Sequence, residues 1–315
     1  MTDKTENEDK IEIGRRGFIR SIFGLGTLKA TEAPAVARES AAFFWCNLKN
    51  GQVGFPTGFH VPCERPGSIM KLVAAAVLLE EGIFNLNQEL ECTGTHRIGR
   101  EEVHCQKAHG KIDLVHALGF SCNIFFAKAT QRLTTRAFLT QARAFGLATS
   151  CAGRPAGPFP DESKHSLPDS SLHYVLGLAE DLKPSSLALM RLAALIAVGP
   201  GGTLPVLHSA EDFELKSKEA PLKNTLSKNT NDILIKGMRL CARQGTGRKL
   251  DEADKLKIAL KTGTTPHGAK FQSTLIGFFP FDDPKHAVCL FSPSGTSQDT
   301  AVPKAREFLM ATEWP

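Results

Sequence analysis

The sequence has no run of about 18 consecutive apolar residues, so it contains no strong candidate for a membrane-spanning helix. It also lacks a large charge surplus, because 38 Lys and Arg stand against 33 Asp and Glu for a formal charge of +5. A surplus this small argues against nucleic acid as the main partner. It fits either attraction to an anionic polymer or simple solubility. At 315 residues, with 42% hydrophobic and 23% charged residues, the composition is that of an ordinary globular protein.

The first 37 residues have the pattern of an export signal rather than of a folded element. Two arginines, Arg15 and Arg16, precede a short apolar stretch (residues 21–28) and small residues at 35–37. This order resembles a twin-arginine signal, although Lys29 directly follows the apolar stretch. The alternative is a disordered cytoplasmic tail. We predict export to the periplasm or another compartment outside the cytoplasm, and we leave membrane association open.

Eight cysteines are present, and an exported protein would fold where thiols are oxidised. Cys92 and Cys105 flank a turn-rich stretch from Thr93 to Gly99, so we predict a disulfide between the two arms of a hairpin. The other six are expected to stay reduced. Four of these lie in apolar runs typical of small buried side chains: Cys46, Cys122, Cys241 and Cys289. If the protein stays in the cytoplasm, all eight thiols are expected to be free.

The same neighbourhood contains several residue types that bind metals. They are Cys92, His96, His104, Cys105 and His109. Their spacing fits no common zinc pattern. We therefore predict neither a metal nor a cofactor.

Apolar periodicity predicts strands near both ends of the chain and helices in the middle, with one closing helix. The expected strands are 42–48, 52–55, 257–261, 273–281 and 286–292, and the expected helices are 68–81, 114–133, 185–198, 229–243 and 302–313. The simplest arrangement is one antiparallel sheet built from both chain ends with a helical insertion. This is an α+β fold and not a βαβ repeat.

Ser68 and Lys71 form the first of three short motifs. Because Ser68 opens a predicted helix, its hydroxyl would lie near the positive end of the helix dipole. Lys71 would lie on the same face one turn away. A serine hydroxyl is a poor nucleophile until a base takes its proton. A lysine can be that base where burial and a neighbouring cation lower its pKa.

Two further motifs follow, Ser121-Cys122-Asn123 in a helical segment and Lys261-Thr262-Gly263-Thr264 at a strand end. Lys261 would be the neighbouring cation, and Thr262 and Thr264 would offer hydroxyls to a carboxylate. Gly263 would let a substrate backbone lie against the strand. Each motif alone is common by chance, on a solvated helix face, in a helix interior or where a strand turns into a loop. All three, in this order and context, indicate a serine acyltransferase site.

With their surroundings, the motifs resemble the transpeptidase domain of class B penicillin-binding proteins over roughly residues 40–315. The likeness includes Arg65-Pro66-Gly67-Ser68, Leu78–Gly82, Cys92-Thr93-Gly94, Phe145-Gly146-Leu147 and residues 201–204 and 276–280. The resemblance implies a β-lactamase/transpeptidase-like domain at 38–315. Its α/β part would comprise about 38–75 and 225–315, and its helical part about 76–224.

By that resemblance, Ser68 is the nucleophile acylated by peptides that end in D-Ala-D-Ala, and Lys71 is its base. Ser121 would relay a proton to the leaving group. Asn123 would contact the substrate backbone or Lys71.

The resemblance implies that Lys261, Thr262 and Thr264 bind the terminal carboxylate of the peptide. Together with Gly263 they would line the site. The backbone N–H groups of Ser68 and Thr264 would form an oxyanion hole. The implied partners are peptidoglycan stem peptides and β-lactams, with cell-wall assembly proteins as further candidates and nucleic acid excluded.

The chain departs from the family pattern in two places. Residues 177–181 lack a Gly-Gln-Gly-like run, and Ser273-Thr274 stand where a tryptophan is common. Three functions stay open: a D-Ala-D-Ala transpeptidase or D,D-carboxypeptidase, a β-lactamase, or a non-catalytic penicillin-binding sensor or assembly module. We favour the first, because no acidic loop residue is placed as a deacylating base and the motif residues, Asn123 included, are intact.

Overall fold

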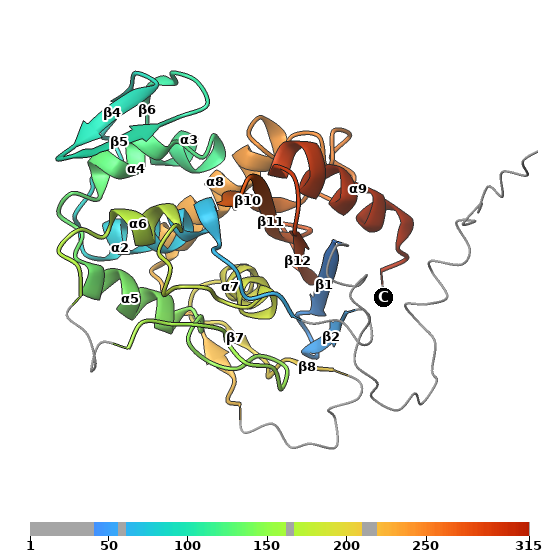
Figure 1. The fold of residues 1–315 in the computed structure, drawn as a ribbon. Helices are drawn as coiled ribbons and strands as arrows, with labels where there is room; N and C mark the ends of the chain where they lie inside the picture. The colour runs from blue at the N-terminus through green and yellow to red at the C-terminus, as the bar shows by residue number, and fades with distance from the viewer. Residues whose placement is uncertain (1–40, 56–60, 162–166, 210–218, 315) are drawn as a thin grey trace, which may run out of the picture.

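Figure 1 shows the computed structural model, which describes residues 41–55, 61–161, 167–209 and 219–314. Residues 1–37, for which we predicted an export signal, lie outside these ranges. Within them, no helix is long and apolar enough to cross a membrane.

A six-stranded sheet in the order β10-β11-β12-β1-β2-β8 joins the two ends of the chain. Its strands are β1 (Ala42–Asn47), β2 (Gln52–Gly54), β8 (His208–Ser209), β10 (Ala259–His267), β11 (Lys270–Phe279) and β12 (His286–Ser292). β1 pairs antiparallel with β12, from Ala42 opposite Phe291 to Asn47 opposite His286. The predicted α+β fold, with an antiparallel sheet built from both chain ends, is confirmed. β8 is an addition, because it comes from the middle of the chain and pairs in parallel with β2.

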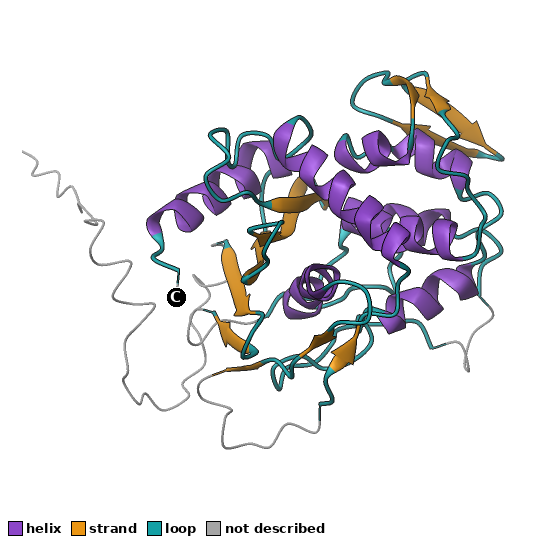
Figure 2. Cartoon of the chain, turned by 180° about the vertical axis from the view of Figure 1, so that it is seen from behind, coloured by secondary structure: helices purple, strands orange, loops and turns teal. Residues whose placement is uncertain are grey.

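Helices make up most of the middle of the chain and flank the sheet (Figure 2). They are η2 (Gly67–Met70), α2 (Lys71–Glu80), α3 (Leu114–Gly119), α4 (Asn123–Ala129), α5 (Thr135–Ala144), α6 (Leu172–Leu176), α7 (Ser186–Val198), α8 (Lys228–Arg243), η3 (Ser297–Ala301) and α9 (Val302–Ala311). The helices predicted at 185–198, 229–243 and 302–313 correspond to α7, α8 and α9. The single helix predicted at 114–133 is wrong, because the chain leaves helical geometry between α3 and α4.

The sheet has apolar side chains packed on both faces. Successive side chains of a strand point to opposite faces, so Phe44 joins the cluster around α7 while Phe43 joins the cluster under α9. Phe43 stacks on Phe308 of α9 with ring centroids 3.7 Å apart. Helix α7 is buried over nearly its whole length, as expected for a helix that is apolar on every side. The sheet therefore lies between α7 on one face and α9 on the other.

Three small two-stranded sheets complete the fold. They pair β3 (Leu90–Cys92) with β6 (Gly110–Ile112), β4 (Thr95–Ile98) with β5 (Glu101–His104), and β7 (Thr203–Leu204) with β9 (Leu222–Lys223). In both views the β4–β5 hairpin lies at the end of the molecule away from α9 (Figures 1 and 2). Val103 is the single buried side chain in these two strands. This hairpin therefore has almost no apolar core of its own.

Strand β11 allows a matched test of the core. Phe278 is 0% exposed and Phe271, in the same strand, is 49% exposed. We expect Phe278→Ala to lower the free energy of unfolding by about 3–5 kcal/mol, because it removes a buried ring and leaves a cavity. Phe271→Ala should change it by less than about 0.5 kcal/mol. Urea unfolding of the two variants measures both values, and equal losses would contradict the burial assigned to this strand.

Candidate active site

Ser68 lies on a tight turn whose backbone geometry requires glycine. The turn is η2, and α2 follows it at Lys71, so Ser68 precedes the α-helix instead of opening it as we expected. Gly67 has φ +58°, a conformation that L-residues with a Cβ rarely adopt. Ser68 is half-buried, whereas both of its neighbours are buried. The turn thus leaves the serine accessible in an otherwise closed segment.

Lys71 is fully buried beneath this serine. Its Nζ lies 3.0 Å from Ser68 Oγ, 2.8 Å from the carbonyl oxygen of Ser121 and 2.5 Å from Oδ1 of Asn123. The last two atoms can only accept hydrogen bonds, whereas a hydroxyl can donate or accept. The sequence spacing of Ser68 and Lys71 therefore brings them together as we expected.

Burial is the main cause that lowers the pKa of Lys71 to about 7, and the positive charge of Lys261 lowers it further. Burial also lowers the pKa of Lys261 to about 8. Near neutral pH, a substantial fraction of Lys71 is therefore a free amine with a lone pair. Most of Lys261 keeps its charge.

Ser121 connects the two lysines because it ends one helix and precedes another. Its φ is +57°, in the left-handed region. Its N–H donates to Leu118 O, and the N–H of Cys122 donates to Ala117 O, which is the bond pattern of a Schellman helix end. The turn directs the carbonyl of Ser121 to Lys71 and its hydroxyl to Lys261, whose Nζ lies 2.9 Å away. A non-glycine residue held in this conformation is typical of a functional site.

Asn123 is the first residue of α4, and it is held from three sides. Its Oδ1 accepts from Lys71, its Nδ2 donates to His104 O at 2.7 Å, and its N–H points to Cys105 Sγ at 3.2 Å. Asn123 thus contacts Lys71, one of the two contacts that we expected. The contacts with His104 and Cys105 also connect the motif to the end of β5.

The third motif lies inside β10 rather than at a strand end, because β10 continues to His267. β10 is the edge strand of the sheet. Gly263 has a structural role in addition to the one that we predicted. A Cβ on Gly263 would lie 2.3 Å from the carbonyl oxygen of Pro66. Only a glycine at this position therefore lets the serine turn pack directly against β10.

The two threonines of this motif point to one face of β10, since residues two apart in a strand share a face. Thr262 Oγ1 lies 2.5 Å from Thr246 Oγ1, and Thr264 Oγ1 lies 3.1 Å from Ser297 Oγ. We did not identify Thr246 or Ser297 from the sequence, because neither belongs to a motif. The result is a set of hydroxyls on this face of β10, whereas Lys261 lies on the other face, where its Nζ contacts Ser121. Hydroxyls and an ammonium group are both donors that a carboxylate can accept from.

Gly177 is a third residue that motif spacing did not reveal. Its carbonyl accepts from the N–H of Gly67 at 3.1 Å, and its φ is +68°. A Cβ on Gly177 would lie 2.0 Å from the carbonyl oxygen of Gly67. The segment that departs from the expected Gly-Gln-Gly-like run therefore still supplies a glycine that supports the serine turn.

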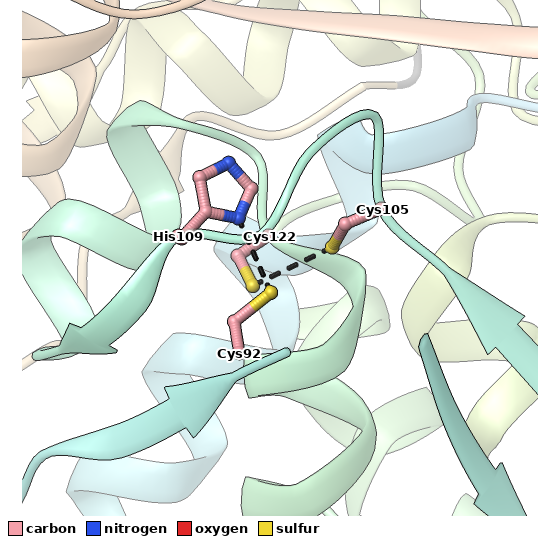
Figure 3. Close-up of side chains that lie close together, drawn as sticks. All are labelled: Cys92, Cys105, His109 and Cys122. Carbon is pink, nitrogen blue, oxygen red and sulfur yellow. Dashed lines mark hydrogen bonds between the residues drawn. The ribbon is translucent and has the colours of Figure 1, made fainter. Parts of the chain in front are cut away.

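The cysteines next to the site differ from our prediction. All eight are free thiols, so the predicted disulfide between Cys92 and Cys105 is not formed. Cys92 does lie near Cys105, but His109 and Cys122 join them (Figure 3). The sulfurs of Cys105 and Cys122 are 3.6 Å apart, although we had expected Cys122 to have no close partner. The hydrogen bond from Cys122 lowers the pKa of the Cys105 thiol below its ordinary value.

Residues 64–310 match the family model described as penicillin binding protein transpeptidase domain. That range contains all three motifs. Among curated proteins, the penicillin-binding protein PbpB of Mycolicibacterium smegmatis is 25% identical over an alignment of 256 residues, and the match covers 71% of this chain and 38% of the relative.

Solved structures share the fold. PBP2 from Helicobacter pylori superposes with a TM-score of 0.69 and 18% identity over 87% of this chain and 60% of that chain, and its complex with MreC matches as well. PBP2 from Pseudomonas aeruginosa, in complex with WCK 5153, gives a TM-score of 0.73 and 18% identity over 87% of this chain and 71% of that chain. The chain thus spans less than two thirds of the length of PbpB and of the H. pylori protein.

The contact between Gly177 and Gly67 gives a matched test of the serine turn. Gly177 and Gly82 both have positive φ, but a Cβ on Gly82 would meet nothing within 4 Å. We expect Gly82→Ala to lower the free energy of unfolding by about 1–2 kcal/mol through backbone strain alone. Gly177→Ala should lower it by about 2–5 kcal/mol, since a steric clash adds to the strain. Denaturant unfolding compares them, and an equal loss would argue against the contact.

Proposed function

The chain belongs to the family of penicillin binding protein transpeptidase domains, and we propose that its Ser68 forms an acyl-enzyme with peptides that end in D-Ala-D-Ala. One observation carries the proposal. A neutral lysine amine has two N–H groups and one lone pair, and Lys71 has two partners that can only accept, on Ser121 and Asn123. The lone pair is left for the hydroxyl of Ser68, 3.0 Å away.

In the proposed acylation, Lys71 takes the proton of Ser68 while Ser68 Oγ bonds to the carbonyl carbon of the penultimate D-Ala. The bond between that carbon and the nitrogen of the terminal D-Ala then breaks. The proton returns to the leaving amine through the hydroxyl of Ser121, which lies against Lys261. If an amine then attacks the ester, the transpeptidase reaction is complete. If water attacks it, the result is the hydrolysis carried out by a D,D-carboxypeptidase.

The terminal carboxylate of the peptide is assigned to Lys261 and to the hydroxyls of Thr262 and Thr264. A charged donor with several neutral donors binds a carboxylate well in a site where water is scarce. The N–H groups of Ser68 and Thr264 are proposed as the oxyanion hole. Since β10 is an edge strand, a peptide can lie along it as an added strand, with Gly263 in the middle of the motif.

A β-lactamase would need a second base that drives fast hydrolysis of the acyl-enzyme. Within the described residues, no carboxylate is hydrogen-bonded to Ser68 or Lys71, and the partners of Lys71 are those given above. This arrangement supports a long-lived acyl-enzyme and favours the transpeptidase or carboxypeptidase over the β-lactamase. A purely non-catalytic sensor would have no need for a buried lysine with a lowered pKa.

Peptidoglycan stem peptides lie outside the cytoplasm, so the proposed reaction takes place there. This agrees with the export expected from residues 1–37. Cell-wall assembly proteins are proposed as partners, because the H. pylori relative has been solved in complex with MreC.

Covalent labelling tests the proposal. We expect fluorescent penicillin to add one adduct to the wild-type chain and none to Ser68→Ala, which lacks the nucleophile. Ser150→Ala, at an exposed serine, is the control and should be labelled fully. Intact-mass spectrometry counts the adducts. Slow release of the label supports the proposed function, release within seconds would indicate a β-lactamase, and a full adduct on Ser68→Ala would refute the assignment.

The lowered pKa of Lys71 predicts how acylation depends on pH. The neutral amine is the base, so the acylation rate should rise with pH, with a midpoint near the pKa of about 7. Below the midpoint the rate should fall about tenfold per pH unit, because the protonated amine has no lone pair. Above the midpoint, Lys71→Ala should lower the rate by about 10²–10⁴-fold, and it should remove this dependence on pH.

Lys261 gives the complementary variant. Its positive charge lowers the pKa of Lys71, so Lys261→Ala should raise that pKa and move the midpoint to higher pH. Lys261→Arg keeps the charge and should leave the midpoint in place, even if binding of the carboxylate weakens. Stopped-flow acylation from pH 5 to 9 measures the three profiles. Identical midpoints for Lys261→Ala and the wild type would contradict the electrostatic coupling of the two lysines.

A further inference from the structure

Four side chains next to the active site offer ligand atoms that all lie within 4.8 Å of one another: Cys92, Cys105, His109 and Cys122. The Cys105 and Cys122 sulfurs are 3.6 Å apart, and Cys92 Sγ is 3.3 Å from Nδ1 of His109. Two sulfurs bound to one zinc at about 2.3 Å each, in a tetrahedron, would be roughly 3.8 Å apart. These two separations are therefore close to those of a tetrahedral zinc shell, and the remaining ones are no larger than 4.8 Å.

We propose that Cys92, Cys105, His109 and Cys122 bind one Zn²⁺ ion, through three thiolates and the Nδ1 atom of His109. Figure 3 shows the four side chains pointing toward one another from separate segments. All three sulfurs bind as thiolates, so each thiol that is still protonated releases its proton to solvent when the metal binds. With four protein ligands the shell is closed, as in structural zinc sites, and the ion takes no part in the reaction.

The ligands come from the ends of elements, which explains why sequence spacing did not reveal the site. Cys92 ends β3, Cys105 follows β5, His109 precedes β6 and Cys122 caps the start of α4. Backbone bonds fix the first three, because Cys105 N–H donates to Gly94 O and His109 N–H donates to Cys92 O. Our prediction from the sequence considered only the cysteines and histidines between residues 92 and 109. It therefore did not include Cys122.

The environment of the sulfurs suits metal-bound thiolates. The N–H of Asn123 points to Cys105 Sγ at 3.2 Å, and the N–H of Phe125 points to Cys122 Sγ at 3.3 Å. Hydrogen bonds of this kind orient ligands and stabilise their charge. The ring of His109 stacks on Phe120 with an interplanar angle of 3°, which holds its orientation.

The surrounding strands have a physical need for such a site. The β4–β5 hairpin buries almost no side chain, and small elements of this kind are commonly stabilised by a metal or a disulfide. Zinc would join β3, the end of β5 and the start of β6 to α4. The free energy of metal binding then contributes directly to the folding of this region.

The site also reaches the proposed active centre, and this part of the inference rests on the proposed function. Cys122 lies between Ser121 and Asn123, so a metal bound to its sulfur fixes the residue between the two that contact Lys71. Cys105 accepts from the N–H of Asn123. Zinc would therefore hold Asn123 and Ser121 in place without touching substrate, and its ligands act as positioning residues.

Metal content tests the site independently of catalysis. We expect the full chain, purified without chelator, to contain about one zinc per chain by elemental analysis. After exchange, Co²⁺ should give the sulfur-to-cobalt charge-transfer band and the intense visible bands of a tetrahedral thiolate site. Cys92→Ser and, as a second variant, His109→Gln should bind Co²⁺ at least about tenfold more weakly. Cys63→Ser, at a half-buried cysteine outside the cluster, is the control and should bind it like the wild type.

Several results would overturn the metal site. These are a wild-type chain without zinc that gives no cobalt spectrum, or an unchanged spectrum in Cys92→Ser and His109→Gln. A disulfide between Cys105 and Cys122, found by peptide mapping of the purified chain, would also overturn it, because a bond of about 2.05 Å removes two ligands.

Acylation tests the positioning role. Removal of zinc should slow penicillin acylation of Ser68 by about tenfold or more, and added Zn²⁺ should restore the rate in Cys63→Ser but not in Cys92→Ser. Zinc bound with no change in acylation would contradict the positioning role alone. If no form of the protein is acylated, the proposed function fails, while the cobalt spectrum still reports on the metal site.

Discussion

Burial of Lys71 is the constraint on which the rest of the site depends. An ammonium group in a closed interior is unfavourable, so burial shifts the equilibrium toward the neutral amine. A neutral amine must still satisfy its two N–H groups, and the carbonyl of Ser121 and the side chain of Asn123 do so. This requirement places the second motif next to Lys71, and the positive charge of Lys261 in the third motif lowers the pKa of Lys71 further.

The second constraint is the close approach of backbone segments around the serine turn, which packs against β10 and the end of α6. The turn contains Gly67 and packs against Gly177 and Gly263. A Cβ on Gly177 would lie 2.0 Å from a carbonyl oxygen of the turn, and a Cβ on Gly263 would lie 2.3 Å from the carbonyl oxygen that precedes it. The turn is therefore clamped between β10 and the end of α6, two elements that are far apart in the chain. Precise placement of the nucleophile results from tight packing of main chain rather than from side-chain contacts.

The sequence predicted the features that depend on residues close together in the chain, such as apolar runs and short motif spacings. Apolar runs predicted β12 and α7 closely, and the spacing of Ser68 and Lys71 predicted their contact. Features created by tertiary contact could not be predicted in this way. Ser121 breaks a helical pattern although it is not a glycine, and Cys122 looked like an ordinary apolar residue until the fold placed it beside three other ligand atoms.

The pairing of β1 with β12 has a consequence for the order of folding. Ala42 lies opposite Phe291, so the two central strands of the sheet are separated by most of the chain. The contact order of this pairing is high, and such contacts form late because a long loop must close first. During synthesis, β1 must wait for β12 to leave the ribosome before the two can pair. Until then its apolar residues are exposed to aggregation, which makes an early chaperone contact valuable to this protein.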